Sequence, residues 1–229
     1  TVIEGVDVTN DDVGTVLANS ALKDVTIDVV VHNAGSLNGT RDIKGAGEMF
    51  EDQKIHKVSP ARMMAAFNVN CLGVLRVQQA VNGQMKSPGG KICILSTGMA
   101  SIADNGSGGI HAYRCSKAAV NMLGKGIAVD MKKDGKGIAV VNVAPGMVQT
   151  GFGPGAEMMK NMGAMSVGVS CKGLIKVFDD LTIGGLQSSN FESLDWRSGR
   201  LPERLSGRLP KRHSDGILNG LGGVFGGSW

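Results

Sequence analysis

The chain has 229 residues, of which 42% are hydrophobic and 19% are charged, a composition typical of a soluble globular protein with one substantial core. It contains no uncharged apolar run long enough to cross a bilayer, so the sequence predicts no transmembrane segment. No targeting leader is visible at its start. The net charge of +4 comes from residues 195–212, which hold six basic and two acidic residues. The remainder is balanced, which argues against a nucleic-acid surface.

The four cysteines are scattered and match no zinc-binding spacing. We therefore expect no metal site. Free thiols are typical of a reducing compartment, here the cytoplasm or an organelle interior.

Three apolar runs, residues 26–35, 91–97 and 137–146, predict short strands. Continuous runs of this kind are typical of parallel strands that are buried on both faces by helices. Helical patterns separate or follow them at 59–86, which begins with a Ser-Pro capping signal, and at 112–133 and 166–181. This alternation predicts an α/β fold with an open, doubly wound, mostly parallel sheet of the Rossmann type.

The composition changes near residue 190. The pentapeptide SGRLP occurs at 198–202 and again at 206–210, and a glycine-rich segment fills 216–229. We predict a domain over 1–190 and a basic, glycine-rich extension with weak intrinsic structure over 191–229. Its arginines suit an acidic protein partner or anionic headgroups, and the alternative is a solvated, disordered tail.

The only tyrosine, Tyr113, lies four residues before Lys117 in a predicted helix. Residues at this spacing share one helix face, and a nearby ammonium group stabilises phenolate. The spacing thus predicts that Lys117 lowers the pKa of Tyr113 from about 10 towards neutral pH.

Thr97 ends a predicted strand, and ligands of such sheets bind at the carboxyl ends of the strands. Its hydroxyl is suited to hold a carbonyl oxygen while Tyr113 exchanges a proton with that oxygen. Reduction of the carbon then needs a nicotinamide cofactor, because no side chain supplies hydride.

Six motifs resemble those of the short-chain dehydrogenase/reductase family in order and approximate spacing, over roughly residues 1–185. They are VDVTND (6–11), HNAG (32–35), NVNCLG (68–73), KICILST (91–97), AYRCSK (112–117) and NVAPGMVQT (142–150). The segment before Tyr113 is most similar to the carbonyl-reductase-like or C-factor-like members.

The resemblance implies catalytic roles for four residues. Tyr113 matches the acid/base, and Lys117 matches the residue that lowers its pKa and binds the nicotinamide ribose. Asn70 matches the asparagine of a proton relay, and Thr97 stands where the family usually has serine, with Ser96 as a fallback. Structural alternatives remain: packing for the tyrosine, a helix-joining hydrogen bond for the asparagine, and a strand-end cap for the threonine.

The resemblance also implies a site for NAD or NADP. The matching residues are Asp7 and Val8 on the adenine side, Asn33, Ala34 and Gly35 beside the adenosine ribose, Tyr113 and Lys117 at the nicotinamide ribose, and Pro145, Gly146, Val148 and Thr150 in the loop over the nicotinamide. His32 departs from the family's asparagine, and we expect it to be a structural hydrogen-bonding residue. Five methionines between 147 and 165 suit either an adaptable apolar substrate pocket or ordinary helix packing.

The family's glycine-rich phosphate-binding turn, T-G-x-x-x-G-x-G, does not occur in this sequence. Residues 1–10 resemble the family's third strand, so an N-terminal βαβ unit is expected to be missing from this chain. Strand one of the family lies at the centre of the sheet. We therefore expect a strand at 3–8 that stands apart from the strand at 26–31 by two strand widths, about 14 Å. In this family, the residues that select NAD or NADP normally follow strand two, which is part of the missing unit. The choice between the two cofactors is therefore left open.

Two functions fit these patterns. The first is an oxidoreductase that transfers hydride between a nicotinamide cofactor and a small carbonyl or alcohol substrate, with an apolar pocket. The second is a weakly active or inactive reductase-like accessory subunit of a larger assembly, suggested by the missing turn and the basic extension. One fold hosts many functions, so the fold by itself does not choose between them.

Overall fold

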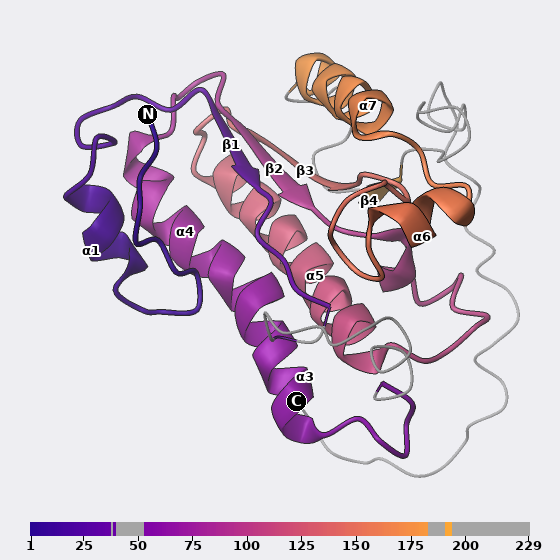
Figure 1. Ribbon diagram of the computed structural model, residues 1–229. Coiled ribbons are helices and arrows are strands. Elements are labelled where there is room, and N and C mark those ends of the chain that lie inside the picture. Colours follow the sequence, from indigo (N-terminus) through magenta and orange to yellow (C-terminus); the bar gives the residue numbers. More distant parts are fainter. Residues whose placement is uncertain (38, 40–52, 183–190, 194–229) are drawn as a thin grey trace, which may run out of the picture.

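The computed structural model describes residues 1–37, 39, 53–182 and 191–193 (Figure 1). The described strands form one parallel sheet, which confirms the predicted α/β class. In spatial order they are β1 (Val29–His32), β2 (Lys91–Leu95), β3 (Ala139–Ala144) and β4 (Phe191–Ser193).

The helices predicted from the sequence are present. The 59–86 pattern is one nearly continuous run, and Ser59 caps it by accepting a hydrogen bond from the backbone N–H of Arg62 at 3.2 Å. The run comprises α3 (Pro60–Phe67), the π-helical η1 (Asn68–Leu72), α4 (Gly73–Val81) and the 3-10 turn η2 (Asn82–Gln84). The other described helices are α1 (Val13–Ala18), the 3-10 turn η3 (Gly98–Ala100), α5 (His111–Lys133), α6 (Ala156–Asn161) and α7 (Val167–Asp180).

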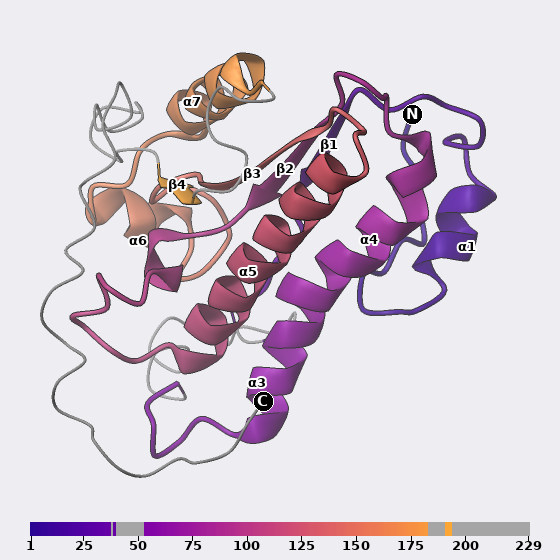
Figure 2. The same ribbon diagram turned by 180° about the vertical axis from the view of Figure 1, so that it is seen from behind.

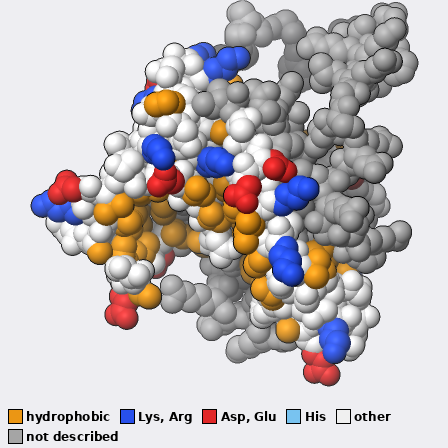
Figure 3. Space-filling view, turned by 90° about the horizontal axis from the view of Figure 1, so that it is seen from above, with side chains coloured by type: hydrophobic (Ala, Val, Ile, Leu, Met, Phe, Trp, Pro, Cys, Tyr) orange, Lys and Arg blue, Asp and Glu red, His pale blue; other side chains and the backbone are white. Residues whose placement is uncertain are grey.

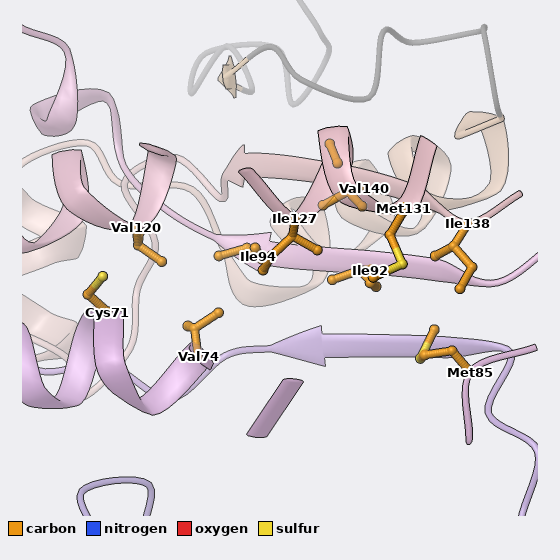
Figure 4. Close-up of a cluster of buried hydrophobic side chains, with 11 residues drawn as sticks. Cys71, Val74, Met85, Ile92, Ile94, Val120, Ile127, Met131, Ile138 and Val140 are labelled. Carbon is orange, nitrogen blue, oxygen red and sulfur yellow. The ribbon is translucent and has the colours of Figure 1, made fainter. Parts of the chain in front are cut away.

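One face of the sheet is covered by α5 and by the α3–α4 run (Figure 2). Because side chains of a strand alternate between faces, Ile92 and Ile94 of β2 and Val140 of β3 point to this side. They pack against Val120 and Ile127 of α5 and other members of the main core cluster (Figure 4). Each buried aliphatic side chain of this kind contributes up to about 1.5–3 kcal/mol, so this interface holds α5 firmly on the sheet.

The other face is covered by α7 over β2 and β3. Val143 packs against Val177, and Cys93 and Val141 lie in a cluster with Leu181 just beyond the helix. At the start of β2, Lys91 donates hydrogen bonds to the last carbonyls of the helix, from Phe178 at 2.6 Å and Asp179 at 3.1 Å. These contacts satisfy carbonyl groups that a helix end leaves without intrahelical partners.

The prediction that the strands are buried on both faces is confirmed for β3 and is wrong for β1. Val29 is 44% exposed and Val31 is 46% exposed, because α7 covers only the neighbouring strands. The carbonyl of Asp28 accepts from Lys91 of β2, so the alternate backbone groups of Val29 and Val31 point to the outer edge. Within the described part of the chain, no strand pairs with that edge.

The strand expected at 3–8 is also wrong. Residues 1–12 form no strand, and Ile3 and Val6 instead pack against α1 and α4 at Val13, Leu17 and Val81. A lone segment without a neighbouring strand gains no hydrogen-bonded ladder, so it buries its apolar side chains on helices. There is consequently no separated strand and no two-strand gap of the predicted kind.

The boundary predicted at residue 190 stays a prediction. Residues 191–193 form β4 at the edge of the sheet, parallel to β3, so the extension begins with paired strand. Residues 194–229, with both SGRLP repeats, lie outside the described residues. None of the described helices is long and apolar enough to cross a membrane.

Candidate active site

The predicted site lies at the edge of the sheet where the parallel strands end. Asn33–Gly35 follow β1, Ser96 and Thr97 follow β2, and Pro145 follows β3. The start of α5 is packed beside η3, which brings Tyr113 to the same edge. At the opposite end of the sheet, a cavity of about 540 Å³ lies between residues 24–26 and 83–87. None of the predicted site residues lines this cavity.

Tyr113 and Thr97 are brought together as predicted. Tyr113 is 8% exposed, and the Thr97 side chain lies beside its phenol, where it acts to lower the pKa of the phenol. The Thr97 hydroxyl also accepts from the backbone N–H of Met99 at 3.2 Å, which caps η3 and fixes the position of the hydroxyl.

The predicted direction of the tyrosine shift is wrong. Burial raises the pKa of Tyr113 to about 12, and the Thr97 side chain lowers it by less than burial raises it. Desolvation disfavours the charged phenolate, and the Lys117 ammonium donates instead to the carbonyl of Leu95 at 2.7 Å. In this geometry, therefore, Tyr113 is a neutral phenol at physiological pH.

Lys117 lies one helical turn after Tyr113 and is buried as well. Burial lowers its pKa to about 8, and the Coulombic effect of Cys71 opposes this shift. The ammonium form therefore still predominates at pH 7, although it loses its proton more easily than an exposed lysine.

Asn70 sits in the π-helical segment η1 and is fully buried. Its Nδ2 donates to the carbonyl of Ser36 at 2.7 Å and to Oγ of Ser116 at 2.8 Å, and its Oδ1 accepts from the N–H of Ser36 at 2.8 Å. A Cβ atom placed on Gly35 would lie 3.4 Å from Oδ1 of Asn70 and 3.7 Å from Nζ of Lys117. Gly35 thus passes close to both side chains, and no side chain of its own intervenes.

The residues expected on the adenine side are partly brought together. Val8, Asn33 and Ala34 line one cavity of about 170 Å³, with His32 and Gly73 also in its wall. Arg76 ties the first of these segments to α4 by donating to the carbonyl of Val8 at 3.2 Å and to the carboxylate of Asp11 at 2.5 Å. The carboxylate of Asp7 accepts from the backbone N–H and the hydroxyl of Thr9, so it shapes the turn in which Val8 lies.

His32 is a buried hydrogen-bonding residue, as expected. Its Nε2 lies 3.0 Å from Oε1 of Gln78, and burial lowers its pKa. Ser96, the fallback for Thr97, is buried, and its hydroxyl has no hydrogen-bond partner among the described residues. It is the Thr97 side chain that lies beside the phenol.

The loop expected over the nicotinamide returns to Tyr113. It contains Pro145, Gly146, Val148 and Thr150, and Val148 bridges to Met165 while the carbonyl of Pro145 accepts from Ser170 at 2.8 Å. Just after it, the Phe152 ring lies 6.0 Å from the Tyr113 ring, centroid to centroid, at 53°. Of the methionines noted in this region, Met165 is buried, and Met158 and Met162 are about half exposed.

Three side chains of the site were not found by sequence reasoning. Phe152 contacts the Tyr113 ring, and Ser116 contacts Asn70. Arg114 holds the segment before α5, because its guanidinium donates to the carbonyls of Met99 and Gly109. Ser116 and Arg114 lie within the AYRCSK motif, which was the only available signal, and it does not reveal their distant partners.

Comparisons with known proteins show which family the chain resembles. A family model described as short chain dehydrogenase matches residues 2–160. The chain is 33% identical over 203 residues to 1-hydroxy-2-glutathionyl-2-methyl-3-butene dehydrogenase of Rhodococcus sp. (strain AD45), covering 86% of this chain and 80% of that protein. It is 32% identical over 157 residues to C-signal of Myxococcus xanthus, covering 68% and 82% of the two chains.

A solved structure shares the fold. A short-chain dehydrogenase/reductase from Burkholderia multivorans with bound NADP aligns with a TM-score of 0.63 at 30% identity, covering 84% of this chain and 73% of that one. The matched family model spans more than half of the chain and includes the motifs around Asn70, Thr97 and Tyr113. The chain belongs to the short chain dehydrogenase family.

Proposed function

We propose that this chain is an NAD(P)-dependent oxidoreductase that interconverts a carbonyl and an alcohol, with Tyr113 as its acid/base. The observation that carries the proposal is the placement of the Thr97 side chain beside the Tyr113 phenol, at the edge where the strands end. A member of a dehydrogenase family with this pair in place is suited to hold a carbonyl oxygen and to protonate it.

The residues present fit the cofactor. Gly35 leaves room beside Asn70 and Lys117 that a Cβ atom would fill, and Asn33 and Ala34 line the cavity next to Val8. We assign the ribose and adenine contacts to these positions and to Asp7, and the nicotinamide side to Lys117 and the loop of Pro145, Gly146, Val148 and Thr150. The bound NADP of the Burkholderia relative supports a nicotinamide dinucleotide here, and the choice between NAD and NADP stays open.

When bound, the nicotinamide cofactor supplies or accepts the hydride at carbon. The chain's own residues handle the proton. Because burial raises the pKa of Tyr113 to about 12, the phenol is protonated at neutral pH and can donate to a carbonyl oxygen that Thr97 positions. The Lys117 ammonium, with a pKa of about 8, lies one turn away as a source of the proton that restores the phenol. We assign Asn70 to the same proton relay.

The substrate is proposed to carry an apolar group next to its carbonyl. Leu37 is buried against Tyr113, and Met99 and Ile110 pack against the pair. Phe152 adds an aromatic ring that is 41% exposed. Apolar and aromatic surface of this kind around one polar pair is typical of small-molecule sites.

The protein is further proposed to work as an enzyme in a reducing compartment and to bind a protein partner. The inactive accessory subunit is not favoured, because family membership and oxidoreductase relatives support an enzyme. The four cysteines are free, which supports a reducing compartment. A protein partner of 191–229 is still proposed from charge alone, since 194–229 lie outside the described residues.

Steady-state kinetics of the full-length protein and of Tyr113→Phe test the function. Oxidation of NADPH or NADH is followed with a panel of aryl and aliphatic ketones and aldehydes. We expect the variant to lose at least about 100-fold in kcat, the usual scale for losing general acid catalysis, with little change in the KM of the cofactor. Phenylalanine keeps the ring that contacts Phe152, so the fold is preserved. Equal turnover by both proteins, or turnover by neither, rejects the proposal.

A further inference from the structure

Ser116 joins two parts of the chain that lie 46 residues apart. The residue is 1% exposed, and its hydroxyl accepts from Nδ2 of Asn70 at 2.8 Å and donates to the backbone carbonyl of Tyr113 at 2.9 Å. One hydroxyl therefore connects the π-helical segment η1 with the first turn of α5. Both residues that it contacts belong to the proposed active site.

The hydrogen-bond pattern determines which way each group points. The N–H of Ser36 is a donor and its carbonyl is an acceptor, so Oδ1 of Asn70 must face the former and Nδ2 the latter. The second Nδ2 hydrogen then points at Oγ of Ser116, which accepts it. The serine hydrogen remains for the carbonyl of Tyr113. No alternative amide orientation satisfies all four contacts.

Asn70 occupies an irregular part of its helix. Asn68–Leu72 adopt π-helical geometry between α3 and α4, and π turns are frequent at functional sites because they redirect a side chain. Without Ser116, one buried N–H of the Asn70 amide would have no partner among the contacts described, and its satisfaction would require a shift of the π turn. Such a shift would also disturb the surroundings of Lys117. Oδ1 of Asn70 and Nζ of Lys117 both lie within 4 Å of the position that a Cβ atom added to Gly35 would take.

We propose that Ser116 is a positioning residue that holds the Asn70 amide and the Tyr113 backbone in catalytic register. It acts through Asn70 and does not touch the reacting atoms. The inference rests on the proposed function, because Asn70 and Tyr113 are assigned there to proton transfer. Placement errors of about 1 Å in such groups can reduce rates by as much as about 100-fold, so this contact is expected to matter for turnover.

A double-mutant cycle in the full-length protein tests this inference, with Ser116→Ala, Asn70→Ala and the combined variant. We expect Ser116→Ala to lower kcat about 10-fold and to change the cofactor KM by less than about twofold. In the Asn70→Ala background, the same change should alter kcat by less than about twofold, because the residue through which Ser116 acts is gone. An unchanged kcat in Ser116→Ala, or an equal loss in both backgrounds, overturns the inference.

Ser20 offers a matched control. Its hydroxyl donates to the carbonyl of Leu17 at 2.6 Å, also three residues earlier, and accepts from the N–H of Leu22 at 3.1 Å, far from the site. Ser20→Ala should keep the parent's kcat. A loss of kcat in Ser20→Ala equal to that in Ser116→Ala would show a general effect of stability and would overturn the positioning role.

A readout independent of turnover separates this inference from the proposed function. Hydrogen exchange of the buried Asn70 side-chain amide, measured by NMR, should be at least about 10-fold faster in Ser116→Ala than in the parent. The reason is that one of the two hydrogen bonds donated by Nδ2 is lost. Unchanged exchange overturns the role of Ser116 whatever the activity. If Tyr113→Phe keeps full turnover while the amide exchange rises and the kcat coupling is present, the acid assignment fails and the positioning of Asn70 stands.

Discussion

The side chain of Thr97 lies beside the phenol of Tyr113, so the end of β2 meets the first turn of α5. The same Thr97 hydroxyl accepts from the backbone N–H of Met99. This hydroxyl is therefore fixed from one side by the backbone and presents its other side to the phenol. A carbonyl oxygen held at this pair would meet both hydroxyl groups.

Replacing Thr97 tests whether its hydroxyl or its shape matters. Thr97→Val keeps the volume and removes the hydroxyl, and we expect kcat to fall by about 10- to 100-fold. Thr97→Ser keeps the hydroxyl and should stay within about threefold of the parent. Steady-state kinetics on one ketone measure both.

The valine variant also loses the cap of η3, at a cost of about 1 kcal/mol in the free energy of unfolding. Urea unfolding at the assay temperature checks that both variants remain folded. If Thr97→Val turns over as fast as Thr97→Ser, the hydroxyl has no part in the reaction.

Burial of Lys117 predicts a pH dependence of stability. Its pKa is about 8 in the folded chain and about 10.5 when exposed, so between these values the unfolded chain binds more protons than the native one. Stability conferred by this residue therefore rises from about pH 8 to pH 10.5, by roughly 3 kcal/mol in order of magnitude. Below pH 8, the buried ammonium costs stability by the same amount.

Lys117→Met isolates this contribution. Urea unfolding of parent and variant between pH 7 and pH 10 should show their difference in free energy moving in favour of the parent as pH rises. The thiol of Cys93 and the phenol of Tyr113, whose pKa values burial raises to about 12, reduce stability at high pH in both proteins and so cancel. A difference that does not vary with pH would contradict the predicted lysine shift.

Phe152 is predicted to select substrates. It lies 6.0 Å from the Tyr113 ring and is partly exposed, so an aromatic group next to the reacting carbonyl can contact it. We expect Phe152→Ala to raise the KM of an aryl ketone by about 10-fold and that of a short aliphatic ketone by less than about threefold. Equal effects on the two substrates would place the ring outside the substrate site.

The outer edge of β1, which no described strand covers, predicts self-association of the protein that an added charge can reduce. Val29 is 44% exposed, and its backbone groups face the edge with which no strand of the described residues pairs. Viewed from the end at which the strands begin, hydrophobic side chains are exposed across the middle of the described surface (Figure 3). Val29→Lys should lower aggregation in light scattering and should cost less than about 1 kcal/mol in unfolding free energy.

Val30 is the matched control on the same strand. Its side chain packs against both the main core and the cluster around Val13, so Val30→Lys should destabilise the protein by at least about 3 kcal/mol. Similar losses in the two variants would show that Val29 is buried in solution.

Much of the fold and several of the site residues could be predicted from local pattern. The buried strands and the helix of residues 111–133 follow from apolar runs, caps and the Asp134-Gly135 stop, which act within a few residues. The placement of Thr97 beside Tyr113 follows from parallel strands ending at one edge. Long, strongly patterned elements of this kind depend little on their surroundings.

The sequence by itself determined the parallel α/β framework, the spacing of Tyr113 and Lys117, and the edge at which chemistry is placed. Only the tertiary structure decided that burial raises the pKa of Tyr113 against the opposing effect of Thr97, because desolvation is the sum of every element packed around the phenol. It also decided that residues 1–12 lie on α1 and α4 as irregular chain, since strand formation needs a partner strand in space. The hydrogen bond from Asn70 to Ser116 was likewise decided only by the tertiary structure. The two residues are 46 positions apart, and only the packing of η1 against α5 brings their side chains within 2.8 Å.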